Sequence, residues 1–189
     1  TYDNRADRYP YRNDGTTEIV SAKEMTTAII TDRLPTYVCT LLFRRDLFDT
    51  LTFPESIYYE DRASTFLFTA ACGQGGIIHK SYYRYYCRSG SISRSYSWKH
   101  FRDFAFANLC RLEFINDSGL YSKEEMAAVA SKSADSFLRK LRHMLSKAKT
   151  AEQRAEALAW CHKLHLIPPK THLPLKARMI RWYIRKFIL

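Results

Sequence analysis

The sequence predicts an α+β fold in which helices predominate, and three observations lead to that prediction. Hydrophobic residues make up 46% of the 189 residues, which is enough for a packed core and excludes disordered, collagen-like and low-complexity classes. β-Branched and aromatic residues gather in one stretch, 77–86, and favour a short β element. Beyond it, helix formers recur with helical spacing. We therefore predict a mixed part, residues 1–97, followed by a helical tail, residues 98–189.

In the mixed part, capping signals and hydrophobic spacing predict helices on both sides of a proline. Ser21 and Glu24 have the spacing of a capping box, and Pro35 ends the apolar run that follows them. Three helices are expected, over about 21–33, over about 38–51, and from about 60 to the glycines at 73–76.

The tail contains four expected helices, over about 98–116, 122–148, 150–166 and 172–189. Ser122 with Glu125, and Thr150 with Gln153, have the capping-box form. The first of these helices is expected to end near Gly119, and the third to end at Pro168-Pro169.

The net charge of +11 is confined to the end of the chain. Residues 1–138 hold 17 Lys and Arg against 17 Asp and Glu, whereas residues 139–189 hold 13 against 2. This asymmetry indicates a localised contact with anionic lipid or nucleic acid. No apolar run approaches the roughly 18 residues of a spanning helix, and the first residues are polar, so neither a transmembrane helix nor a signal peptide is visible. We expect a cytoplasmic protein, free or peripheral at the inner face of the plasma membrane.

The cysteines predict reduced thiols. There are five, they lie far apart, and none belongs to a Cys-x-x-Cys pair. Cys161, His162 and His165 lie close together on one expected helix, where either a metal site or ordinary packing would explain them, and packing is favoured.

Two short motifs carry the candidate chemistry. Glu60 and Asp61 stand at a loop-to-helix junction, where carboxylates are stabilised by free N–H groups and by the helix dipole. The same position would let Asp61 act as a base if a substrate hydroxyl came within hydrogen-bond reach. Arg88 begins a loop containing Ser91 and Ser93, whose donors suit a phosphate, although a basic hairpin end explains them as well.

Six tyrosines flank these motifs, at positions 58, 59, 82, 83, 85 and 86. Their rings suit stacking on acceptor sugars, but alternation along a strand with one buried set is the favoured interpretation.

The order and spacing of the segments LLFRRDLFDTLTFPESIYYED and SYYRYYCRSGSIS resemble the C-terminal half of family 2 glycosyltransferases of the GT-A fold. Those bacterial enzymes build capsular, exopolysaccharide and lipopolysaccharide chains, and the similarity covers roughly residues 38–94. The resemblance implies a partial GT-A segment with inverting transfer of a sugar from a nucleotide-sugar donor to a glycan or lipid-linked acceptor.

The same resemblance implies the roles of individual residues. Asp61 would be the general base, and Glu60 would orient the acceptor or the base. Arg88, Ser91 and Ser93 would bind the donor diphosphate and stabilise its charge as it departs.

The resemblance also implies a Mg²⁺ or Mn²⁺ cofactor held by an Asp-x-Asp motif in a nucleotide-binding half, and this sequence contains neither. We therefore interpret the chain as a C-terminal fragment that binds no metal and turns over no sugar nucleotide alone. Loss of the N-terminal sheet would expose an apolar face, so a homodimer of the fragment is a further expectation.

The last expected helix is basic on one side and apolar on the other. Arg178, Arg181 and Arg185 fall within an arc of about 60°, with Trp182 at its edge. The core side is expected to hold Met179, Ile180, Tyr183, Ile184 and Phe187.

Three interpretations of this helix remain open. It caps the helical bundle, or it lies on an anionic membrane through Arg178, Arg181, Trp182 and Arg185, or it binds nucleic acid, which is the least favoured. The competing function is accordingly a non-catalytic helical module that binds anionic membrane or nucleic acid through residues 139–189.

Overall fold

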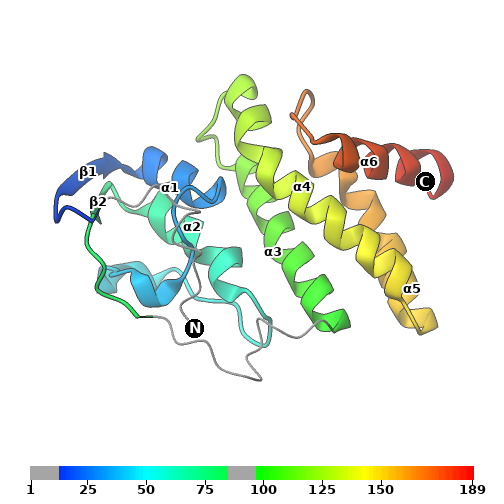
Figure 1. Ribbon diagram of the computed structural model, residues 1–189, viewed down its shortest axis with the longest axis horizontal. Helices are drawn as coiled ribbons and strands as arrows, with labels where there is room; N and C mark the ends of the chain where they lie inside the picture. Colours follow the sequence, from blue (N-terminus) through cyan, green and yellow to red (C-terminus); the bar gives the residue numbers. More distant parts are fainter. Residues whose placement is uncertain (1–12, 85–96) are drawn as a thin grey trace.

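The computed structural model describes residues 13–84 and 97–189, and its fold is helix-dominant α+β, as predicted. A small sheet with α1 and α2 lies at one end, and α3 to α6 lie at the other (Figure 1). The elements are, in order, β1 Thr17–Ser21, α1 Ala22–Ile30, the 3₁₀-helices η2 Val38–Thr40 and η3 Arg45–Asp49, α2 Glu60–Ala71, β2 Gln74–Ile78, α3 Trp98–Asp117, α4 Lys123–Lys147, α5 Ala151–Cys161, the 3₁₀-helix η5 His162–Leu166, and α6 Leu175–Phe187.

The β element is a two-stranded antiparallel sheet. β1 pairs with β2 in a register that runs from Thr17 opposite Ile78 to Ser21 opposite Gln74. The sequence predicted a β element, but β1 was not expected. At Gly75 a Cβ atom would lie 2.2 Å from Cε of Met25 in α1, so the absence of a side chain there lets α1 approach the sheet.

The strand is shorter than the tyrosine pattern predicted. The last backbone pairing is at His79, whose N–H donates to the Thr16 carbonyl and whose carbonyl accepts from the Gly15 N–H, both at 2.9 Å. Tyr82 and Tyr83 therefore lie outside the strand and are exposed, so the alternating-strand interpretation is wrong for both. Tyr85 and Tyr86 lie outside the described residues.

The helix expected over 38–51 is wrong. The segment forms η2 and η3 with extended residues between them, and Leu42 is 99% exposed. Three phenylalanine rings, Phe43, Phe48 and Phe53, instead surround Phe68 of α2 with centroid distances of 5.1, 5.1 and 4.8 Å. The apolar residues thus form an aromatic cluster on α2, which stabilises a segment that contains two short 3₁₀-helices and no α-helix.

The predicted caps of α1 and α4 are confirmed, since both begin with a complete capping box, Ser21 with Glu24 and Ser122 with Glu125. At α5, the Thr150 hydroxyl accepts from the Gln153 N–H, but the Gln153 side chain accepts from Lys149 instead of the cap residue. The four helices expected in the tail are present with shifted ends, because the third closes as η5 and the fourth begins only after Pro174.

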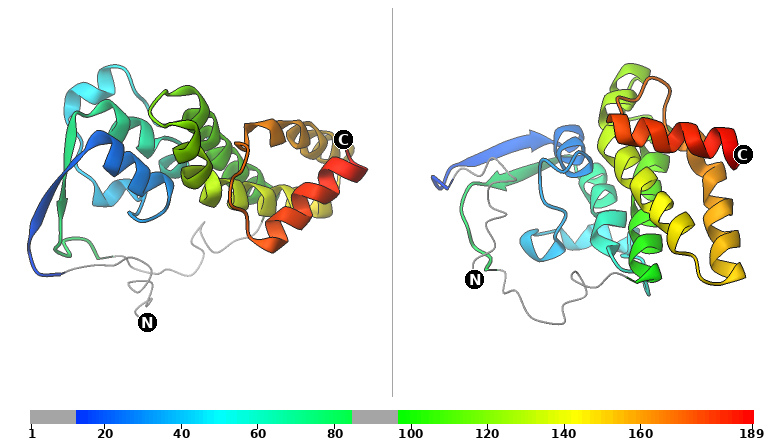
Figure 2. Two further views of the ribbon diagram at one scale, coloured as in Figure 1. Left: turned by 90° about the horizontal axis from the view of Figure 1, so that it is seen from above. Right: turned by 45° about the vertical axis from the view of Figure 1, so that its right-hand side comes forward.

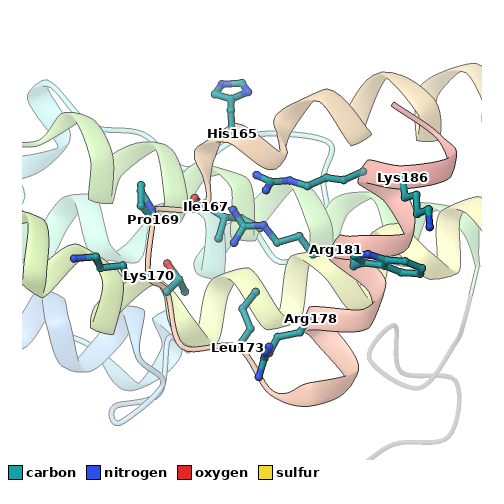
Figure 3. A pocket seen from close by; sticks show the side chains of 11 residues that line it. His165, Ile167, Pro169, Lys170, Leu173, Arg178, Arg181 and Lys186 are labelled. Carbon is teal, nitrogen blue, oxygen red and sulfur yellow. Dashed lines mark hydrogen bonds between the residues drawn. The ribbon is translucent and has the colours of Figure 1, made fainter.

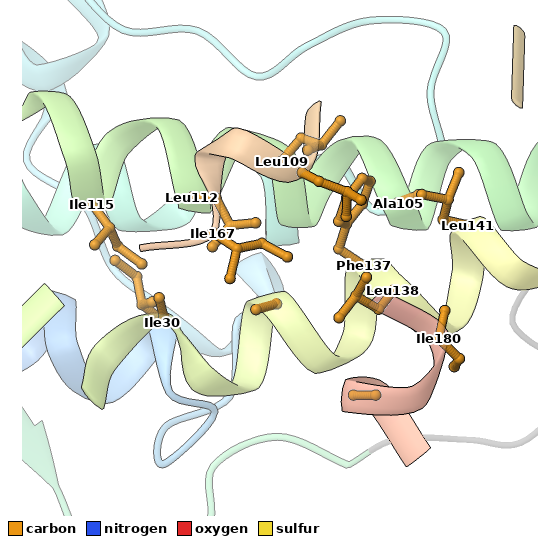
Figure 4. Close-up of a cluster of buried hydrophobic side chains, with 14 of the residues drawn as sticks. Ile30, Ala105, Leu109, Leu112, Ile115, Phe137, Leu138, Leu141, Ile167 and Ile180 are labelled. Atoms are coloured by element: carbon orange, nitrogen blue, oxygen red, sulfur yellow. The ribbon is translucent and has the colours of Figure 1, made fainter. Parts of the chain in front are cut away.

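One hydrophobic cluster joins the two ends of the molecule. α3 packs along α4, and both contribute to a core that also receives Ile30 from α1, Phe66 from α2 and Ile180 from α6. Figure 4 shows Ile30 and Ile180 among the side chains of this cluster, between the helices. Residues before and after residue 97 therefore share one core.

We predict that Phe137→Ala lowers the free energy of unfolding by about 3–5 kcal/mol, because Phe137 is fully buried in this core and truncation leaves a cavity. Urea denaturation measures the change. Leu42→Ala is the control, and because Leu42 contacts solvent it should change the free energy by less than about 0.5 kcal/mol. Equal effects of the two substitutions would contradict the described core.

Candidate functional site

The acidic pair predicted to carry chemistry opens helix α2. Tyr59 precedes it in a left-handed conformation, with φ 64° and ψ 35°, which is uncommon for a bulky residue and turns the chain sharply into the helix. Glu60 is exposed, and Asp61 is half-buried with its Oδ1 accepting from the Arg62 N–H at 2.6 Å. Both carboxylates thus occupy the first turn, as predicted.

The environment of Asp61 makes its carboxylate a stronger base than an ordinary aspartate. Burial raises the pKa of Asp61, and the charge of Glu60 acts in the same direction. The hydrogen bond from the Arg62 N–H and the charges of Arg111 and Arg62 oppose that rise without cancelling it. A half-buried carboxylate with a raised pKa suits proton abstraction.

Beneath Asp61 lies a buried ion network, formed by Asp32, Arg62, Asn108 and Arg111. Arg62 donates from Nη1 and Nη2 to the two carboxylate oxygens of Asp32, at 2.9 and 3.1 Å. Arg111, whose side chain is fully buried, donates from Nη1 to the same carboxylate at 2.9 Å. Asn108 Oδ1 accepts from Arg62 Nε and Nη2 at 3.3 and 3.2 Å.

The network holds two guanidinium groups against one carboxylate. Although burial acts to raise it, the charges of Arg62 and Arg111 hold the pKa of Asp32 below its usual range. Burial, with repulsion from Arg62, lowers the pKa of Arg111 to about 10. Arg111 Nη2 has no hydrogen-bond partner, so positive charge remains in excess under the start of α2.

A second ion cluster fixes the loop that leads into α2. Asp103 on α3 accepts from the Tyr58 N–H at 2.9 Å and from Lys99 Nζ and Arg102 Nε at 2.7 Å each. Lys99 Nζ also donates to the Ser56 carbonyl at 2.6 Å. The loop before Glu60 is therefore tied to α3.

Rings complete this attachment of the loop to α3. The Tyr58 ring lies 4.6 Å from His100, and the Tyr59 ring lies 4.9 Å from Phe104. Both tyrosines thus pack against α3, which gives them a structural part in positioning the start of α2.

Sequence reasoning missed Asp32, Arg62, Asp103 and Arg111. The available signal was the placement of Arg111 among positions of α3 that otherwise face the core, such as Leu112 and Ile115. A charged residue at such a position needs a buried partner. Its partner lies 79 positions away in the sequence, at Asp32, and no local pattern connects them.

The predicted diphosphate-binding residues Arg88, Ser91 and Ser93 lie outside the described residues. Their role stays a prediction.

The described residues do not fit Mg²⁺ or Mn²⁺. The carboxylates of Asp32 and Asp103 are each held by two basic side chains. Within 13–84 and 97–189 no group of three or more His, Cys, Asp and Glu side chains is arranged to hold a metal ion.

The described cysteines are free, as predicted, and Cys87 lies outside the described residues. Cys161 is buried, its thiol donates to the Ala157 carbonyl at 3.4 Å, and burial raises its pKa to about 11. His165 Nδ1 contacts the His162 carbonyl at 2.7 Å. These contacts agree with the packing interpretation of that cluster.

The four predicted membrane-contact residues meet at one place. Arg178, Arg181, Trp182 and Arg185 line a cavity of about 880 Å³ between α6 and the chain that precedes it, which we call the α6 cavity (Figure 3). The prediction of which α6 residues face the core is partly wrong, because Met179, Tyr183 and Phe187 are exposed. The buried positions are Ala177, Ile180 and Ile184, which face the bundle.

Comparisons with protein-family models, with curated proteins and with solved structures gave no match to this chain. Among the helices that the structure describes, none combines the length and the apolar character needed to cross a membrane.

We predict that Asp32→Asn lowers the free energy of unfolding by about 3–5 kcal/mol near pH 7, because it leaves two buried guanidinium groups without a carboxylate. Urea denaturation measures this. The matched control is Asp46→Asn, which disrupts the exposed pair with Arg44 and should cost less than about 1 kcal/mol.

The loss of unfolding free energy in Asp32→Asn should be smaller at low pH. The folded pKa of Asp32 lies below its unfolded value, so its stabilisation is complete above pH 4 or so and is lost as the pH falls through the folded pKa. The difference between the wild type and Asp32→Asn should therefore shrink in acid. A difference independent of pH would contradict the ionised network.

Proposed function

We propose that the chain forms the acceptor side of an inverting glycosyltransferase, in which Asp61 removes the proton from the acceptor hydroxyl. The observation that carries the proposal is the half-buried Asp61 carboxylate, with its raised pKa, at a rigidly anchored helix start. The buried ion network holds this helix start from beneath, and Asp103 holds the preceding loop. Such anchoring suits a base that must meet its substrate in a fixed geometry.

The chemistry needs a base because a sugar hydroxyl is a weak, neutral nucleophile. As the hydroxyl oxygen bonds to the anomeric carbon of the donor, Asp61 takes its proton and the bond from that carbon to the nucleoside diphosphate breaks. The electron pair of the broken bond leaves with the diphosphate. Attack opposite to the leaving group inverts the configuration of the anomeric carbon.

Other residues would assist this reaction. Glu60, exposed beside Asp61, is placed to accept a hydrogen bond from a second acceptor hydroxyl. Arg88, Ser91 and Ser93 are proposed from the sequence to bind the departing diphosphate. Substrates of this kind are a nucleotide-sugar and a glycan or lipid-linked acceptor, as in the synthesis of bacterial surface polysaccharide.

A second candidate function, binding of an anionic partner through residues 139–189, is favoured by the α6 cavity. It concerns α6 and the chain before it, which are separate from the start of α2, and it is compatible with the first.

We predict that Asp61→Asn lowers the rate of transfer by about 10²–10⁴-fold in the protein as it occurs in the cell, because the acceptor hydroxyl loses its base. The measurement is release of nucleoside diphosphate from a panel of UDP-, GDP- and dTDP-sugars, with bacterial membranes supplying acceptor. Asp117→Asn, at an exposed position on α3, is the matched control and should leave the rate unchanged. Full activity of Asp61→Asn would remove Asp61 from the role of base, and no release by the wild type from any donor would reject the enzyme.

The same substitution should stabilise the fold. The pKa of Asp61 is higher in the folded than in the unfolded protein. Ionisation of Asp61 therefore lowers the free energy of unfolding as the pH rises from the unfolded pKa through the folded pKa. Asp61→Asn should therefore unfold at a higher urea concentration than the wild type at pH 7, and the two should converge near pH 3.5. A variant that is less stable than the wild type at pH 7 would show that Asp61 serves structure instead.

A further inference from the structure

The α6 cavity is lined by basic side chains without acidic partners. Its basic members are His165 and Lys170 from the preceding chain, and Arg178, Arg181, Arg185 and Lys186 from α6. No aspartate or glutamate lines it, and within the described part of the chain none of these six forms an ion pair. Uncompensated positive charge in a concave surface concentrates the electrostatic potential and attracts anions.

Arg181 is the most buried of these side chains and the least satisfied. Its Nε is buried without a hydrogen-bond partner, and its Nη2 reaches the Ile167 carbonyl only at 3.5 Å. Burial and the neighbouring charge of Arg185 lower the pKa of Arg181. Figure 3 shows Arg181 extending across the hollow toward Ile167. A guanidinium with free donors in such a place is suited to bind phosphate oxygens.

The outward side of α6 carries exposed apolar and aromatic side chains beside this cavity, with the exposed Lys176 and Lys186 among them. We call the apolar and aromatic set the α6 stripe, and it consists of Leu175, Met179, Trp182, Tyr183 and Phe187. All five are between 54% and 71% exposed, although the opposite side of the helix is already buried against the bundle. Figure 2 shows α6 crossing the bundle beside α4, at the far end from the β1–β2 sheet.

The α6 cavity and the α6 stripe are continuous. Trp182 lines the cavity and belongs to the stripe, and its ring lies 5.7 Å from that of Phe187. The Tyr183 ring lies 5.2 Å from Phe187 on the other side. Lys186 Nζ lies 5.0 Å from the Trp182 ring, so a cation borders the aromatic surface.

We propose that this end of the protein docks in the plane of an anionic bilayer. The α6 cavity takes the phosphate of an acidic phospholipid headgroup, and the α6 stripe enters the boundary between headgroups and acyl chains. Exposed apolar and aromatic residues on one side of a helix, with Arg beside them and Lys among them, suit in-plane binding because long lysine side chains can reach the headgroups. Trp and Tyr side chains favour that boundary, and the basic excess of residues 139–189 attracts anionic lipid.

The same observations disfavour other occupants. A second copy of the chain would bring a like-charged cavity to the interface, which opposes association. Single-stranded nucleic acid would stack on aromatic rings, but the stripe also contains Leu175 and Met179, which offer bases no stacking surface. The inference does not depend on the role of Asp61.

The test is co-sedimentation of the purified protein with phosphatidylcholine vesicles, with or without 30% phosphatidylglycerol. The wild type should bind the acidic vesicles at least tenfold more tightly. The variant Arg178→Gln with Arg185→Gln, at exposed positions, should lose about tenfold or more of that binding. Lys149→Gln with Arg154→Gln removes the same charge from exposed positions outside the α6 cavity and should lose less than half as much.

A spectroscopic measurement tests the stripe separately. Acidic vesicles should shift tryptophan emission to shorter wavelength, and Trp182→Phe should abolish the shift while leaving Trp98 and Trp160 in place. An unchanged shift in Trp182→Phe would overturn insertion of the α6 stripe.

Five further outcomes would overturn the proposal. Equal binding to neutral and acidic vesicles, or equal losses in the two double variants, would remove the α6 cavity from recognition. Binding of inorganic phosphate or pyrophosphate in calorimetry without vesicle binding would assign the cavity to a soluble ligand. Tighter binding of a single-stranded oligonucleotide than of acidic vesicles would assign it to nucleic acid. A dimer that is lost in Trp182→Phe would place a second copy on the α6 stripe.

Discussion

The carboxylate of Asp32 is the interaction on which the arrangement of this molecule depends. It lies just beyond the end of α1, and it binds Arg62 at the start of α2 and Arg111 in the middle of α3. Arg111 also donates to the carbonyls of Ile30 and Arg62, so one side chain satisfies backbone groups of two other helices. Removing the carboxylate would leave two cations in a nearly dry interior, where isolated charge is very costly. The three helices therefore have one relative position that satisfies this network.

The unequal charges of the network also bear on the proposed base. Two guanidinium groups share one ionised carboxylate, and their excess positive charge acts on Asp61, one residue before Arg62. That charge limits how far burial raises the pKa of Asp61. An apolar replacement of the network would favour protonation of Asp61.

The parts of the fold that local physics determines were predictable, and the parts that distant contacts determine were not. Capping boxes at Ser21 and Ser122 located two helix starts, because each requires only residues within one turn. β1 forms because β2 lies opposite, and the segment 38–51 follows the aromatic cluster at Phe68 in place of its own helical spacing. At the candidate site the sequence located Glu60 and Asp61, but the long-range partners of Arg62 and Arg111 had no local signal. On α6 the helical period of the sequence identified the arc of Arg178, Arg181 and Arg185. It did not distinguish the side of the helix that packs on the bundle from the side exposed to solvent.

The shared hydrophobic core has a geometric consequence for any substrate. Ile30, Phe66 and Ile180 belong to one cluster, so among the described residues the start of α2 and the surface of α6 move as a single body. α3 alone, with 20 residues, spans about 30 Å. If α6 rests on a bilayer, Asp61 is held at a set height above it, and an acceptor anchored in lipid can present its hydroxyl only when its glycan has the matching reach. Rigidity between the two ends would thereby act as a molecular ruler, selecting acceptors by length before any sugar is recognised.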